Sequence, residues 1–185
     1  LQWRMFKYCD DQCGLGCAAM RTMGMATSII HIPAWGSRSV GHEYNAALDP
    51  QTGKWTKFSP GADYSWGPGM IRKPPKAFVN NYTSPSQNSN ELREYQNMID
   101  ITHQYNNVVD IPVKVDPGLG KEFEFAYLAT FDNTTWRPTM WGKIKDSTVL
   151  FKDMGCGLVY LPVAQKDKQL YIIGNPLQVD TFRNI

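Results

Sequence analysis

The chain has 185 residues, of which 42% are hydrophobic and 12% aromatic, so it can bury a substantial core and is not expected to be disordered. Its formal net charge of +2 is too small to indicate binding to nucleic acid or to an acidic membrane surface. No apolar run approaches the length of about 18 residues that a membrane-spanning helix needs. Residues 1–8 lack the apolar segment of a signal peptide, so we expect a cytosolic protein or, preferably, the trimmed form of a longer one.

A helix is predicted over residues 9–23, and it carries three of the four cysteines. Its second half is rich in helix-forming residues such as Ala18 and Ala19, and Gly24 is a suitable stop. Cys9, Cys13 and Cys17 follow one another at helical spacing and therefore share one face. Neighbouring thiols on one helix bridge poorly, so no disulfide framework is expected and the redox compartment stays open.

The first half continues with predicted strands at residues 25–32, 42–48 and 54–58, the last two joined by a hairpin turn at residues 49–53. A Gly- and Pro-rich loop follows at 59–75, and a short apolar element at 76–82. Residues 83–90 are rich in Ser and Asn, and residues 91–98 can form one or two helical turns. We therefore predict a first domain over 1–82 and a linker over 83–98.

The second half has a different pattern. About seven short apolar segments alternate with turn signals such as Asp116-Pro117-Gly118 and Asp132-Asn133. This spacing predicts an antiparallel β-sandwich over residues 99–185. The expected fold class is therefore α+β: a helix packed on an antiparallel sheet, followed by a β-sandwich.

One pair of residues in the first half suggests chemistry. A helix followed by antiparallel strands could bring Cys9, at the start of the predicted helix, close to His42, at the start of a predicted strand. A thiol beside an imidazole is the minimal set for cysteine nucleophilic catalysis, because the imidazole accepts the proton that keeps the thiol inert.

The motifs around this pair resemble those of the transglutaminase-like superfamily, which has a papain-like cysteine fold. The matching segments are Cys9 with Asp11, Arg21-Thr22-Met23-Gly24-Met25, Gly41-His42-Glu43-Tyr44-Asn45, and Gly53-Lys54-Trp55-Thr56-Lys57-Phe58. More narrowly, residues 127–133 and 151–162 resemble the C-terminal region of transglutaminase-like Bacteroidetes proteins that end in a β-sandwich. The family's N-terminal helices have no counterpart in this chain.

The resemblance implies a role for each matching residue. Cys9 would be the nucleophile and His42 the general base, and Gln2 or Trp3 could supply an oxyanion donor. The family's third catalytic residue is an Asp, but Ser59 stands in that slot, and Asp63 is the candidate substitute. The implied activity is that of an amidohydrolase, peptidase or acyltransferase acting on peptide or glutamine amide bonds of a protein substrate. The implied location is the bacterial periplasm or cell surface, and no cofactor is expected.

Two other interpretations stay open. Ser59 in the acid slot is also compatible with a catalytically inactive protein of the same fold that binds a glycan or a protein at the cell envelope. Alternatively, Cys9, Cys13 and Cys17 could form a tetrahedral zinc site together with His31 or His42, although zinc sites on one helix are uncommon. His31 and His103 have no partner in the sequence pattern and are expected to be structural.

Overall fold

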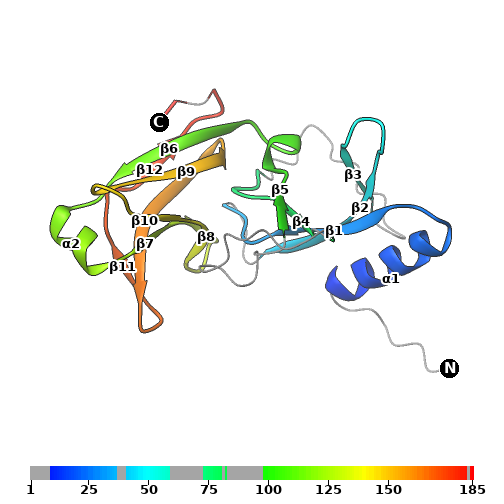
Figure 1. Ribbon diagram of the computed structural model, residues 1–185, viewed down its shortest axis with the longest axis horizontal. Coiled ribbons are helices and arrows are strands. Elements are labelled where there is room, and N and C mark those ends of the chain that lie inside the picture. The colour runs from blue at the N-terminus through cyan, green and yellow to red at the C-terminus, as the bar shows by residue number, and fades with distance from the viewer. Residues whose placement is uncertain (1–8, 37–40, 59–72, 81, 83–97, 183) are drawn as a thin grey trace.

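The computed structural model describes residues 9–36, 41–58, 73–80, 82, 98–182 and 184–185. It is mostly β-structure, with one N-terminal helix packed on a five-stranded antiparallel sheet and further antiparallel sheets in the C-terminal half (Figure 1). The expectation of a helix on an antiparallel sheet, followed by a region of short strands, is therefore confirmed at this level.

Helix α1 spans Cys9–Thr22, close to the predicted range. Its C-terminus is closed by two backbone hydrogen bonds, from Gly24 N to Arg21 O (3.0 Å) and from Met25 N to Met20 O (3.1 Å). Gly24 has φ of +77°, which makes this a Schellman motif with glycine in the left-handed position. The glycine that the sequence indicates as a stop therefore ends the helix by its backbone conformation.

The first sheet has the strand order β3-β2-β1-β4-β5, and each pairing of neighbouring strands in it is antiparallel. Its strands are β1 (Thr27–Ile32), β2 (His42–Leu48), β3 (Trp55–Phe58), β4 (Phe78–Asn80) and β5 (Met98–Asp100). The first three begin at or within two residues of the predicted positions. In the β2–β3 turn, Asp49 accepts hydrogen bonds from Gln51 N and Thr52 Oγ1, as expected of an Asp in a tight turn.

The two faces of this sheet are covered differently. Helix α1 lies against one face, while the other face carries a buried cluster that includes Ile30, Trp35 and Tyr44. Because side chains alternate along a strand, neighbouring residues of β1 and β2 belong to opposite faces. This alternation decides which residues can meet α1.

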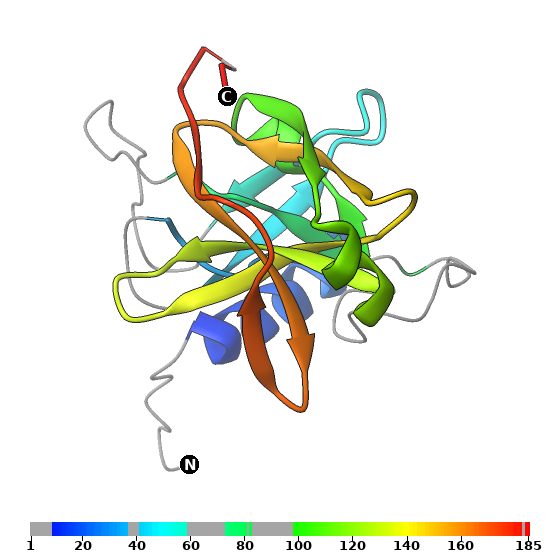
Figure 2. The same cartoon turned by 90° about the vertical axis from the view of Figure 1, so that its left-hand side faces the viewer.

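The C-terminal half, as far as the structure describes it, contains seven further strands and the short helix α2 (Pro117–Glu122). Strands β7 (Phe125–Phe131), β8 (Trp136–Lys143), β10 (Leu158–Lys166), β11 (Gln169–Ile172) and β12 (Leu177–Val179) form one sheet, and β6 (Val108–Lys114) pairs with β9 (Thr148–Gly155). The largest buried cluster draws on both groups, including Ile111 of β6, Leu128 of β7, Phe151 of β9 and Tyr160 of β10. Figure 2 shows these strands crossing one another around that core.

The start of the second half differs in detail from the sequence prediction. Strand β5 begins at Met98, the last residue of the predicted linker, and pairs with β4 of the first sheet. Residues 98–100 are therefore part of the first sheet. The predicted helical turns at 91–97, and the rest of the linker at 83–90, lie outside the described residues.

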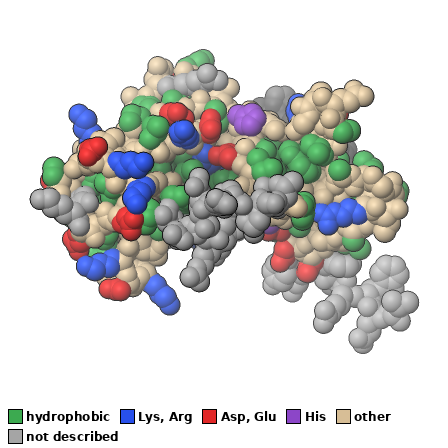
Figure 3. All heavy atoms as spheres, in the orientation of Figure 1, with side chains coloured by type: hydrophobic (Ala, Val, Ile, Leu, Met, Phe, Trp, Pro, Cys, Tyr) green, Lys and Arg blue, Asp and Glu red, His purple; other side chains and the backbone are tan. Residues whose placement is uncertain are grey.

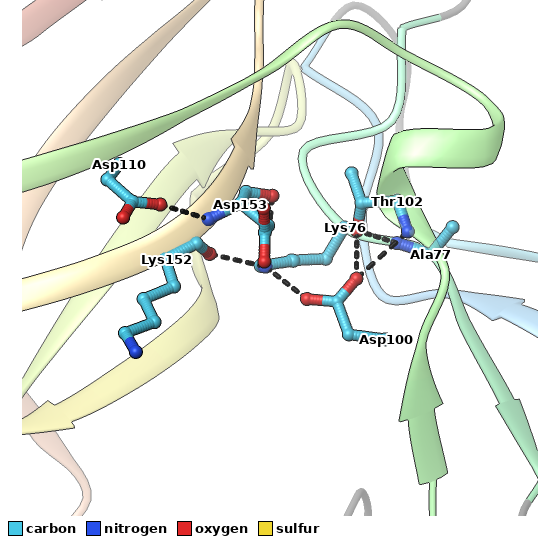
Figure 4. Close-up of polar contacts among 7 residues, drawn as sticks. All are labelled: Lys76, Ala77, Asp100, Thr102, Asp110, Lys152 and Asp153. Carbon is cyan, nitrogen blue, oxygen red and sulfur yellow. Dashed lines mark hydrogen bonds and ion pairs between the residues drawn. The ribbon is translucent and has the colours of Figure 1, made fainter.

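Lys76 connects the two halves. Its side chain is fully buried, and its Nζ donates hydrogen bonds to Asp100 Oδ2, to Lys152 O (2.6 Å) and to Asp153 O (3.0 Å), as Figure 4 shows. Asp100 belongs to β5, whereas Lys152 and Asp153 belong to β9. One lysine therefore ties the first sheet to the C-terminal strands.

The surface has a mixed charge. On the face shown in Figure 3, Lys and Arg side chains alternate with Asp and Glu side chains over the C-terminal strands at the left. In the part of the chain that the structure describes, no helix is both long and apolar enough to cross a bilayer.

Candidate active site

A series of side-chain hydrogen bonds joins helix α1 to strands β1 and β2 of the first sheet. The Arg21 guanidinium donates to Thr27 O (3.2 and 2.8 Å), and Thr27 Oγ1 donates to Cys17 O (3.4 Å). One level further along the sheet, Asn45 Nδ2 donates to Cys13 O (2.6 Å) and contacts Cys17 Sγ at 3.2 Å. The helix and the sheet therefore stay in contact from the C-terminal end of α1 toward its first turns.

Two residues further along β1 and β2, a histidine faces a glutamate. His31 of β1 lies opposite Glu43 of β2 in the strand register, and His31 Nδ1 is 2.7 Å from Glu43 Oε1. Two residues along a strand advance by about 6.6 Å, slightly more than one helical turn of about 5.4 Å. The charge of Glu43 also acts on the Cys13 thiol, so the pair lies near the turn of α1 that carries Cys13.

The second nitrogen of this imidazole is buried, and no described residue pairs with it. Among the described residues, His31 Nε2 is buried and makes no hydrogen bond, while Nδ1 is held by the Glu43 carboxylate. Buried polar atoms are nearly always hydrogen-bonded, so an unpaired one requires an explanation. An imidazole oriented by a carboxylate through one nitrogen, with the other nitrogen available, is the arrangement of a catalytic base.

The cysteines of α1 differ in accessibility. Cys13 and Cys17 are buried, whereas Cys9 is partly exposed. Burial raises the pKa of the Cys13 thiol to about 12, with a further contribution from the charge of Glu43. Cys13 therefore stays protonated near neutral pH, where a thiol is a poor nucleophile. Of the three cysteines on this helix, Cys9 is the most exposed.

His42 lies on the other face of the sheet. Its ring packs edge-on against Tyr44, with 4.4 Å between the ring centroids, and Tyr44 belongs to the buried cluster opposite α1. Alternation along β2 places Glu43 and Asn45 on the α1 face and His42 and Tyr44 on the opposite face. The structure thus brings His31, rather than His42, to the face that α1 covers, and the Cys9–His42 pair stays a prediction.

The other predicted site residues lie outside the described part of the chain. These are Ser59 and Asp63 in and near the acid slot, and Gln2 and Trp3 as oxyanion donors. For the zinc interpretation, the described residues contain no group of three His, Cys, Asp or Glu side chains arranged to hold a metal ion. Cys17 and Asn45 instead contact each other.

Sequence reasoning missed His31 and Glu43 as partners. The available signal was alternation, because His31 lies between Ile30 and Ile32, which are buried on the face opposite α1. Glu43 shares the face of His31 only if the two strands pair in the observed register. That register is a property of how the two strands pack, which no local sequence pattern determines.

Comparison with known proteins identified no relative of this chain. No protein-family model, curated protein or solved structure matches this chain. A function is therefore inferred from the geometry of the site and from the motif resemblance alone.

Proposed function

We propose that this protein is a cysteine-dependent acyl-transfer enzyme of the transglutaminase-like type, with a partial papain-like core followed by a β-sandwich. It acts on peptide or glutamine amide bonds. The observation that carries the proposal is the His31–Glu43 pair, which lies on the face of the sheet that α1 covers and, within the described part of the chain, leaves one imidazole nitrogen without a hydrogen bond. In this proposal Cys9 is the nucleophile, His31 the base and Glu43 the residue that orients the base.

The first half-reaction would form a thioester. His31 Nε2 takes the proton of Cys9, and the thiolate sulfur attacks the carbonyl carbon of the amide. Backbone N–H groups in the first turn of α1 stabilise the oxyanion, since they have no partner within the helix. When the C–N bond breaks, His31 returns the proton to the departing ammonia or amine.

The second half-reaction would release the acyl group. Water or a primary amine attacks the thioester carbonyl while His31 takes its proton, and the Cys9 thiol leaves with that proton restored. Water gives hydrolysis, and an amine gives a new amide bond. Throughout, the Glu43 carboxylate stabilises the imidazolium form of His31 and fixes its ring.

Cysteine alkylation tests the proposed site without a known substrate. Wild type and the variants His31→Ala, His42→Ala and His103→Ala would be treated with iodoacetamide at neutral pH, and each cysteine quantified over time by mass spectrometry. We expect Cys9 to react faster than the other three cysteines and to slow in His31→Ala only. Slowing in His42→Ala only would return the base role to the residue that the motif resemblance implies.

A substrate assay tests the reaction itself. The wild-type protein would be incubated with a glutaminyl peptide, with and without a primary amine, and ammonia release measured beside peptide cleavage. Cys9→Ala should abolish either activity. If Cys9 reacts no faster than buried Cys13 and Cys17, and no amide substrate turns over, the proposal of an enzyme is wrong.

A further inference from the structure

A cavity of about 670 Å³ lies where the first half of the chain meets the C-terminal strands. Gly36 and Lys73 line it from the first half, while Phe131, Trp136 and Gln178 line it from strands β7, β8 and β12. We propose that this cavity, named here the aromatic cleft, binds an acidic sugar residue of a glycan. The proposal concerns binding and is independent of acyl transfer at Cys9.

Two aromatic rings form one wall of the aromatic cleft. Phe131 and Trp136 are directly opposite each other in the β7–β8 pairing, with ring centroids 5.5 Å apart and planes inclined at 57°. Phe131 remains 43% exposed. The negative face of an aromatic ring attracts the slightly positive C–H groups on one face of a sugar ring. This wall therefore suits a pyranose better than a ligand that is polar on all sides.

Two polar side chains, Gln178 and Thr181, also line the aromatic cleft. Gln178 is exposed at the middle of β12, between partly buried Leu177 and buried Val179, and Thr181 is exposed two residues after the strand. A glutamine amide both donates and accepts hydrogen bonds, and a threonine hydroxyl does the same. Adjacent sugar hydroxyl groups both donate and accept hydrogen bonds, so they need partners that can do the same.

One ammonium group in the cleft can pair with an acidic ligand. Among the described residues that line the cleft, Asp180 alone is acidic, and its oxygens already accept from Phe182 N (2.7 Å), Asn184 N (2.9 Å) and Asn184 Nδ2 (2.7 Å). Within the same described part of the chain, the ammonium group of Lys73 has no carboxylate at ion-pair distance. The described lining is thus neutral overall, but the Lys73 ammonium group has no ion-pair partner within it, so this group can pair with a carboxylate on the ligand.

Gly157 makes room for that lysine. Its φ is +78°, and a Cβ atom built on it would lie 2.5 Å from Lys73 Nζ. A side chain at this position would therefore displace the ammonium group, besides straining the backbone. The position of the Lys73 ammonium group in the cleft therefore depends on glycine at position 157.

Calorimetric titration of the Cys9→Ala protein tests the proposal, because this variant removes the proposed acyl transfer. The probes are oligosaccharides of galacturonic acid, of glucuronic acid and of sialic acid, each compared with its methyl ester. We expect at least one acid to bind saturably, and its ester to bind about tenfold more weakly because the charge-assisted hydrogen bond is lost. Binding should persist whether or not Cys9 proves to be a nucleophile.

Variants locate the binding site. Lys73→Met should reduce acid binding to the level of the ester and leave ester binding unchanged, while the control Lys114→Met, at an exposed position on β6, should change neither. Trp136→Ala should abolish both, and Gln178→Ala, which removes an exposed side chain, should weaken both without disturbing the fold. The proposal is overturned if no acid binds, if acid and ester bind equally, or if Lys73→Met and Gln178→Ala are both without effect.

Discussion

His31 and Glu43 face each other across strands β1 and β2, with Nδ1 and Oε1 2.7 Å apart, on the same face of the sheet as helix α1. Both side chains are mostly buried, at 20% and 25% exposure. The carboxylate fixes the orientation of the imidazole, and the register of the β1–β2 pairing fixes both. In the proposed reaction, this pair supplies the general base for Cys9.

Replacing Glu43 by glutamine tests the role of its charge. The substitution Glu43→Gln keeps the size of the side chain and one hydrogen-bonding oxygen but removes the charge that stabilises an imidazolium ion. We expect amide turnover to fall on the order of 10²-fold or more, because this is the usual contribution of general acid–base catalysis. Ammonia release from a glutaminyl peptide measures the change. The control Glu124→Gln, in an exposed ion pair with Lys143, should leave turnover unchanged.

Asn45 is expected to hold α1 on the sheet. Its side chain is buried and donates to Cys13 O and toward Cys17 Sγ, so Asn45→Ala leaves a buried carbonyl oxygen without this donor. The expected loss of unfolding free energy is about 1–3 kcal/mol. Urea denaturation measures it. Asn184→Ala, near the C-terminus and exposed, is the matched control; an equal effect of both substitutions would contradict the assigned role.

The buried Cys13 thiol is expected to make the free energy of unfolding depend on pH. Burial raises its pKa in the folded protein from 9.0 to about 12. Below about pH 9 the thiol is protonated in both states, and its contribution is fully present. Between these two pKa values only the unfolded chain releases the proton, so the free energy of unfolding falls by up to about 1.4 kcal/mol per pH unit.

The difference between wild type and Cys13→Ala isolates this effect, because other groups titrate alike in both proteins. Urea denaturation from about pH 7 to about pH 11 should give a difference that is constant up to about pH 9 and then declines. A difference that stays constant over the whole range would show that the thiol is not buried as described.

Lys76→Met should strongly destabilise the junction of the two halves. It leaves Asp100 without its cationic partner and removes the donor to two carbonyl oxygens of β9. Breaking one side of a buried ion pair costs about 3–5 kcal/mol. Lys166→Met removes an exposed ion pair with Glu122 and should cost no more than about 1 kcal/mol. Chemical denaturation of both variants makes the comparison, and similar losses would refute the coupling by Lys76.

Local sequence signals were sufficient for most of the elements, although they did not indicate strand β5 or helix α2. Gly24 marked the end of α1, the turn at residues 49–53 marked the β2–β3 hairpin, and turn residues separated the strands after Val108. These signals are local because capping, turn conformation and side-chain periodicity depend on residues a few positions apart. The motifs that suggest a cysteine enzyme are local in the same sense.

The tertiary structure decided which side chains meet. A shift of one residue in strand pairing sends every side chain to the opposite face, so alternation alone does not settle whether His31 or His42 lies beside α1. The pairing of β5 with the first sheet and the burial of Lys76 likewise depend on contacts between distant segments. The sequence by itself determined α1, most of the strands and their turns. The register of β1 against β2 determined the candidate site, because strand register is a property of packing.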